Sequence, residues 1–218
     1  MSGGLSKAVD KGYGLRTHEM MTLVNGLIPV TMLDECVRLH RRVCPRQVLG
    51  LRMGLYAGEV LGLDLPNKDK RLFTFMETDG CGADGVSVST GCTVGHRTMR
   101  IMDYGKIAAT FVDTFTDVAV RIAPARMIRE QAEFYAPDEK SRWHKQLLAY
   151  QVMPSWQLFN LTYVSLTLPL MDIISRSSRR VECDNCHEEI INQREICRGE
   201  RILCRACADG GYYDIKDM

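Results

Sequence analysis

Hydrophobic positions recur along the chain with helical spacing, and the apolar residues three or four apart predict five helices. The first two are expected over residues 31–42 and 47–61, with Thr31 as the first N-cap. Pro45 disfavours helical geometry at Cys44, so the chain should break between them. The remaining helices are predicted over 83–89, 126–134 and 140–150, and Pro124 is interpreted as the first helical residue of the fourth.

Runs of β-branched and aromatic residues between these helices predict strands. They are expected over 72–76, 99–103, 106–112, 116–122 and 161–166, with Tyr104 and Gly105 joining the second strand to the third. Helices and strands that interleave around a mostly hydrophobic sheet indicate an α+β fold. A polar run over 175–180 predicts a linker, so we expect a main domain over 1–175 and a small module over 176–218.

Composition narrows the classes of protein that the chain can belong to. A length of 218 residues suits one sizeable core with a small appendage. The net charge of +1 gives no support to wholesale binding of nucleic acid or membranes. The first residues lack the apolar core of a secretion signal, and the longest apolar stretch, 161–174, is too short to span a bilayer. We therefore expect a cytoplasmic protein.

Two Cys-x-x-Cys motifs near the C-terminus carry the most specific chemical signal. Cys183 and Cys186 form the first pair, and Cys204 and Cys207 form the second. Four thiolates with this spacing can converge as a tetrahedron around one Zn²⁺, with two sulfurs from each turn. The sequence predicts a structural zinc module that is unfolded without its ion.

The same module contains two further candidate ligands, His187 and Cys197. The symmetry of the paired motifs favours the four cysteines over either of them. The chain holds nine cysteines, an odd number, which fits metal and thiol chemistry better than a disulfide framework.

A second group of reactive residues lies at the ends of predicted elements in the main domain. His40 and Cys44 flank the first helix break, while Cys81 and Cys92 lie among glycines that permit close backbone approach. These four residues are candidates for one shared site. The alternative for each cysteine is a small buried hydrophobe, and the alternative for His40 is a place on a solvated helix face. Cys36 is assigned to the core.

The segment from Gly80 to Gly85 also matches the GxGxxG pattern of dinucleotide-binding proteins. Such a site needs a long helix after the glycines, to hold the pyrophosphate at its N-terminus. Here Gly91 follows within two turns, so the pattern argues against a nucleotide site.

Four motifs together resemble the FmdE family, which is named after a component of formylmethanofuran dehydrogenase. They are His40…Cys44-Pro45, the stretch from Glu77 to Asp84, Gly91-Cys-Thr-Val-Gly95, and Asp103-Tyr-Gly-Lys106, and a CxxC…CxxC tail follows them. The resemblance covers about residues 31 to 208. It implies a mixed sheet with helices on one face, a homodimer, and a metal site, usually zinc, in a cleft built from the His/Cys motif and the cysteine loops.

The chain departs from the family in its first motif, which usually reads His-Gly-His-x-Cys-Pro. Arg42 stands at the second histidine, so one metal ligand is exchanged for an anion-binding donor. The residues after Pro45 are Arg46 and Gln47 instead of a small and an apolar residue. Both changes bear on the cleft and leave the C-terminal module untouched.

The favoured hypothesis is a metal-dependent site that binds or transforms a small molecule. His40, Cys44, Cys81 and Cys92 would hold or flank a second Zn²⁺ with an open position for water or substrate. Cys44, Cys81 and Lys106 are the candidates for catalysis, since Lys106 can neutralise an anionic substrate. Its alternative is an ordinary surface lysine.

The family name comes from genes linked to a methanogenic one-carbon enzyme. A link to one-carbon metabolism is therefore one expectation, either as a metal-dependent enzyme or as an accessory component of an oxidoreductase. The competing hypothesis is a non-catalytic zinc-finger module that binds a protein partner or nucleic acid. Acidic residues nearly cancel the arginines of the tail, which disfavours the nucleic-acid version.

Overall fold

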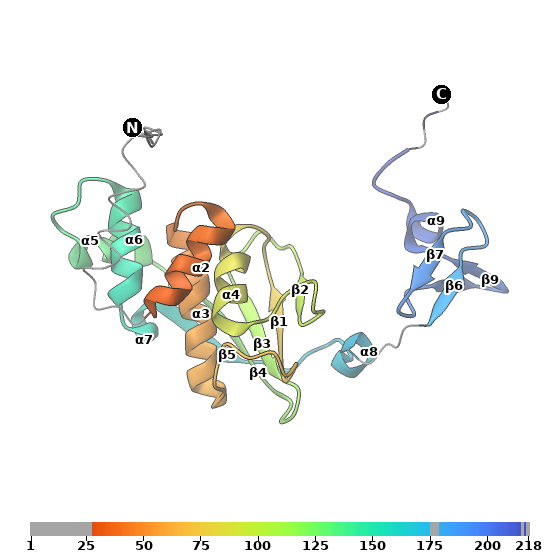
Figure 1. The fold of residues 1–218 in the computed structure, drawn as a ribbon, viewed down its shortest axis with the longest axis horizontal. Coiled ribbons are helices and arrows are strands. Elements are labelled where there is room, and N and C mark those ends of the chain that lie inside the picture. Colours follow the sequence, from red (N-terminus) through yellow and green to blue (C-terminus); the bar gives the residue numbers. More distant parts are fainter. Residues whose placement is uncertain (1–27, 175–178, 215, 217–218) are drawn as a thin grey trace, which may run out of the picture. The chain divides into compact units, whose positions relative to one another are not determined.

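The computed structural model describes residues 28–174, 179–214 and 216, and the chain divides into two compact units between Ser165 and Leu166 (Figure 1). The helices described in the first unit are α2 (Val30–His40), α3 (Pro45–Leu61), α4 (Cys81–Thr90), α5 (Ile128–Tyr135), α6 (Arg142–Val152) and α7 (Ser155–Leu158). Its strands are β1 (Leu72–Met76), β2 (Met99–Ile101), β3 (Ala109–Asp113), β4 (Val118–Pro124) and β5 (Phe159–Tyr163).

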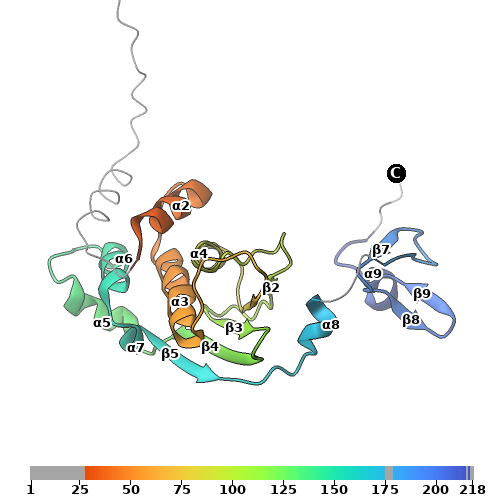
Figure 2. The ribbon, with the colours of Figure 1, turned by 60° about the horizontal axis from the view of Figure 1, so that its bottom comes forward.

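The five strands form one mixed sheet in the order β2-β1-β3-β4-β5. β2 runs parallel to β1, and the other neighbours are antiparallel. Every residue of β1 and β3 is buried, so the centre of the sheet is covered on both faces. Helices α3 and α4 lie over one of these faces (Figure 2), where Met76, Phe111 and Ile122 join the main core. The predicted α+β class with a mixed sheet is confirmed.

Two local predictions differ from the structure. Pro124 does not begin a helix: it ends β4, paired with Phe159, and α5 begins only at Ile128. A fixed φ suits the end of a strand as well as a first helical turn, and the missing N–H is tolerated there. The third strand starts at Ala109 instead of Lys106, because the N–H groups of Tyr104 and Lys106 both donate to the carbonyl of Glu77 and form a loop.

A buried arginine ties α3 to the end of α6. The Arg52 side chain is almost fully buried, and its guanidinium donates to the carbonyls of Tyr150, Gln151 and Met153 at 2.8–3.1 Å, and to the Ser155 hydroxyl at 3.2 Å. The last carbonyls of a helix have no partner within the helix, so Arg52 acts as a C-terminal cap supplied from another element. Burial lowers the pKa of Arg52 to about 10, which still leaves it charged at neutral pH.

Replacement of Arg52 by lysine should therefore destabilise the first unit. A lysine ammonium cannot reproduce the planar fork that reaches several carbonyls at once, so at least one of them loses its donor, at a cost of about 1–3 kcal/mol. Urea unfolding of the full chain measures the difference. The matched control is Arg142→Lys, an exposed position on α6. Equal midpoints for the two variants would contradict the capping role.

The second unit is built from short elements. They are α8 (Leu170–Ile174), β6 (Arg180–Glu182), β7 (Glu189–Ile191), β8 (Ile196–Arg198), β9 (Arg201–Leu203) and α9 (Arg205–Asp209). β6 pairs with β7 and β8 with β9, each as an antiparallel hairpin. Its buried apolar residues are few, namely Cys183, Ile190 and Leu203. Across both units, none of the described helices has the length and hydropathy needed to cross a bilayer.

Candidate functional site

Helices α3 and α4 pack through glycines, and this contact brings two cysteines together. A Cβ atom on Gly50 would lie 2.2 Å from the Gly82 carbonyl oxygen, and one on Gly54 would lie 2.0 Å from the Ser89 hydroxyl. Residues farther along α3 thus meet residues farther along α4, so the two helices run parallel. Their N-termini lie at the same end, where Cys44 is the N-cap of α3 and Cys81 is the first residue of α4.

His40 and Asp84 complete a row of side chains with Cys81. The Cys81 sulfur lies 3.2 Å from Nε2 of His40, and Nδ1 of His40 lies 3.4 Å from a carboxylate oxygen of Asp84. His40 is the last residue of α2, which ends because Arg41 adopts a left-handed conformation with φ of 62°. Asp84 lies one turn after Cys81 on α4. The imidazole is therefore oriented by a carboxylate on one side and meets a thiol on the other.

Gln47 fixes the position of Cys44 and of α2. Its carboxamide oxygen accepts a hydrogen bond from the Cys44 backbone N–H at 3.0 Å, and its Nε2 donates to the Cys36 carbonyl at 3.4 Å. Gln47 is fully buried. Burial raises the pKa of the Cys81 thiol, and a hydrogen bond with Cys44 adds to the increase. Without a cation, this thiol stays protonated at neutral pH.

The structure does not bring Cys92 to this group. Cys92 follows the C-terminal end of α4, so the ten residues of the helix separate it from Cys81 by about 15 Å. Its thiol is buried and donates to the Leu72 carbonyl, and burial raises its pKa. Arg42 and Lys106 are both exposed. Cys36 is fully buried, as expected for a core residue.

A cavity of about 690 Å³ opens beside the two thiols. Its walls come from the start of α3, the segment from Pro124 to Glu130, and α6. Cys44 and Cys81 line it, whereas Lys106 does not. This volume lies in the range of small-molecule pockets. The lining residues Trp143 and Tyr150 were not identified from the sequence, where nothing distinguished them from ordinary positions of an amphipathic helix.

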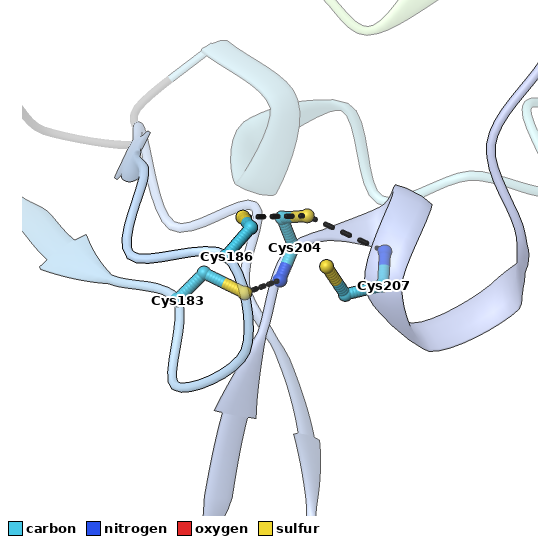
Figure 3. A group of neighbouring side chains, drawn as sticks. All are labelled: Cys183, Cys186, Cys204 and Cys207. Carbon is cyan, nitrogen blue, oxygen red and sulfur yellow. Dashed lines mark hydrogen bonds between the residues drawn. The ribbon is translucent and has the colours of Figure 1, made fainter. Parts of the chain in front are cut away.

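The four C-terminal cysteines lie around one point (Figure 3). Their sulfur atoms are all within 4.8 Å of one another, and those of Cys186 and Cys204 are 3.9 Å apart. Sulfurs bound tetrahedrally to zinc at about 2.3 Å are separated by about 3.8 Å, so the group fits a zinc ion. Among the described residues, no other set of three or more His, Cys, Asp or Glu side chains is this compact.

Backbone N–H groups favour the thiolate form in this cluster. The Cys204 N–H donates to the Cys183 sulfur at 3.3 Å, and the Cys207 N–H donates to the Cys204 sulfur at 3.4 Å. Hydrogen bonds from the backbone N–H groups of Cys186 and Cys204 lower the pKa of Cys183 to about 6. His187 instead contacts Glu182 at 3.0 Å, and neither it nor Cys197 belongs to the group.

A family model described as "FmdE, Molybdenum formylmethanofuran dehydrogenase operon" matches residues 39–160, more than half of the chain. The chain belongs to the FmdE family. The matched range contains His40, Cys44, Cys81 and Asp84 together with the cavity walls, and it ends before the cysteine module. The cleft is therefore part of the FmdE region itself, and the cysteine module lies outside it.

Individual relatives agree with this assignment. The crystal structure of an FmdE-like protein of tungsten formylmethanofuran dehydrogenase from Syntrophus aciditrophicus matches 84% of this chain and 94% of its own, with a TM-score of 0.57 and 23% identity, which shows the shared fold. A probable S-adenosyl-L-methionine-binding protein from Archaeoglobus fulgidus is 37% identical over 84 residues. That match covers 37% of this chain but only 23% of the relative's length.

Proposed function

We propose that this FmdE-family protein binds a small molecule in the cavity beside Cys44 and Cys81, and that these thiols with His40 form a zinc-dependent reactive centre. The observation that carries the proposal is the meeting of Cys81 with the carboxylate-oriented His40 at the wall of a ligand-sized cavity. The family description refers to the formylmethanofuran dehydrogenase operon, which supports a role in one-carbon chemistry, as an enzyme or as an accessory component of one.

The donor set of the cleft fits zinc at two positions. A thiolate and an imidazole nitrogen bound to one zinc ion are separated by about 3.5 Å, close to the 3.2 Å between Cys81 and His40. Asp84 would hold the His40 tautomer in which Nε2 is free to bind the metal. Cys44 is the third candidate, although its sulfur does not lie within 4.8 Å of both other ligand atoms, so its side chain would rotate on binding.

Zinc in such a site supplies a Lewis acid and an open coordination position for water or substrate. The chain's own residues supply the rest. His40 and Cys81 present ligands from two different elements, Gln47 holds Cys44 at the start of α3, and the cavity walls limit access of water. Because Cys92 is at the other end of α4, we propose no role for it in this centre.

Metal content tests this proposal. Elemental analysis of the full chain should give about two zinc ions, and either Cys44→Ser or Cys81→Ser should remove one of them while leaving the C-terminal ion. Cys197→Ser is the matched control, because Cys197 is exposed and outside both groups. One ion per chain, unchanged in Cys81→Ser, would rule out the metal centre of the cleft.

For the C-terminal module we propose a structural zinc site. Four sulfur ligands leave no open position, so the ion stabilises the fold and does no chemistry. The alternative role as a nucleic-acid binder has less support, because Arg180 and Arg198 form ion pairs with Glu189 and Asp209. The homodimer stays a prediction that sedimentation of the full chain can measure.

A further inference from the structure

Three arginines give the cavity a strong positive charge. Arg46, Arg126 and Arg129 line it, against a single acidic lining residue, Glu130. Other arginines of this unit are neutralised by bidentate ion pairs, as Arg71 is by Asp113 and as Arg121 is by Glu77. Among the described residues, no carboxylate forms an ion pair with any of the three cavity arginines. Their guanidinium groups are available to a ligand.

Two helices begin at the same cavity. The first residues of α3 and α5, Pro45 and Ile128, both lie in its wall. Backbone N–H groups in the first turn of a helix lack partners within the helix, and the positive end of the helix dipole attracts anions. The helix ends alone would not define a site, but here they act in the same direction as the arginine side chains.

The rest of the lining is apolar. Leu49, Ile107, Trp143 and Tyr150 form walls in which a hydrocarbon body can be buried. Leu49 and Tyr150 are themselves buried members of the main core, so this part of the cavity is built on a rigid base. A ligand that fits both parts has one anionic group and an apolar portion of several carbon atoms.

We propose that the cavity binds an organic anion, a carboxylate or a phosphate ester, with its charged group at Arg46, Arg126 and Arg129 and its apolar body against Trp143 and Leu49. The ligand would then lie next to Cys44 and Cys81. This inference gives the ligand class of the proposed small-molecule cleft and rests on that function, but it does not require the metal. Guanidinium groups bind both anions in bidentate fashion, so the two sources share one chemistry.

The two tryptophans of the chain permit a direct measurement. Trp143 lines the cavity, while Trp156 is 76% exposed on α7 and lies outside it. In a Trp156→Phe background, Trp143 is the single tryptophan and reports on the cavity. Its fluorescence is titrated with hexanoate, hexyl phosphate, the neutral analogue hexanamide and the short anion acetate. None of these probes absorbs where tryptophan does.

Hexanoate or hexyl phosphate should give a saturable change, and whichever binds more tightly identifies the anion. Hexanamide and acetate should each bind at least about tenfold more weakly, because one lacks the charge and the other lacks the apolar body. The double variant Arg126→Gln/Arg129→Gln should lose about tenfold or more for the anions only. Arg142→Gln, at an exposed position of α6 outside the cavity, is the control and should bind like the parent.

Three results would overturn the inference: no saturable change with either long-chain anion, equal affinity for hexanamide and hexanoate, or unchanged affinity in the double arginine variant. Metal content of each sample separates this outcome from the fate of the zinc centre. Anion selectivity with one ion per chain would leave the ligand class standing and remove the cleft metal. Two ions per chain without anion selectivity would do the reverse.

Discussion

Replacement of Gly85 by alanine is expected to destabilise the first unit by about 3 kcal/mol, at the upper end of the cost of overpacking. A Cβ atom at Gly85 would lie 2.2 Å from the Gln47 carbonyl oxygen and 2.8 Å from the Leu51 nitrogen. Both are backbone atoms of α3, so neither can rotate away, and the helices must separate. Gln47 would move with its helix, and the juxtaposition of Cys44 and Cys81 would be lost together with stability.

The sign of the effect distinguishes packing from helix propensity. Inside an ordinary helix, alanine is more favourable than glycine by about 0.5–1 kcal/mol, so propensity alone predicts a more stable protein. Urea unfolding of Gly85→Ala decides between the two. Gly95→Ala is the control, since a Cβ there meets nothing within 4 Å. A neutral or stabilising result for Gly85→Ala would show that the glycines do not set the distance between α3 and α4.

This interface also explains which parts of the fold the sequence could predict. The second helix and the first strand were predicted almost residue for residue, because a long apolar pattern and a run of aromatic residues are local signals. The regular spacing of Gly50, Gly54 and Gly58 in α3 was present in the sequence, but its meaning depends on which helix lies opposite. The positive φ of Gly80 and Gly91 marks the ends of α4, and those glycines were interpreted as loops on both sides of a shorter helix.

The candidate site divides along the same line. The four C-terminal cysteines are close in sequence, and their spacing predicted a compact group that the structure contains. In the main domain, Cys81 and Cys92 looked alike because both lie among glycines. They are separated by the whole length of α4, and only Cys81 is at the end where α2 and α3 bring His40 and Cys44. The cavity arginines could not be found, since Arg126 and Arg129 acquire their role only where β4 turns into α5.

Removal of zinc should unfold the C-terminal module and leave the first unit folded. The module has little else to hold it: three buried apolar residues and two hairpins whose strands are three residues long. Structural zinc contributes about 10–16 kcal/mol in modules of this kind, far more than such a core can supply. The first unit has an extended core of sheet and helix residues that owes nothing to an ion.

Hydrogen exchange of the full chain, followed peptide by peptide, measures both units at once. Cys204→Ser, or a strong zinc chelator, should abolish protection of the amides over 180–209, while peptides from α3 and β1 keep theirs. Cys204 is the informative position, because its thiol meets Cys186 and also accepts the Cys207 N–H at the start of α9. Cys197→Ser, in β8 and outside the group, should preserve protection. Persistent protection of residues 180–209 in zinc-free Cys204→Ser would mean that the hairpins fold by themselves, and the ion would then have to serve another purpose than stability.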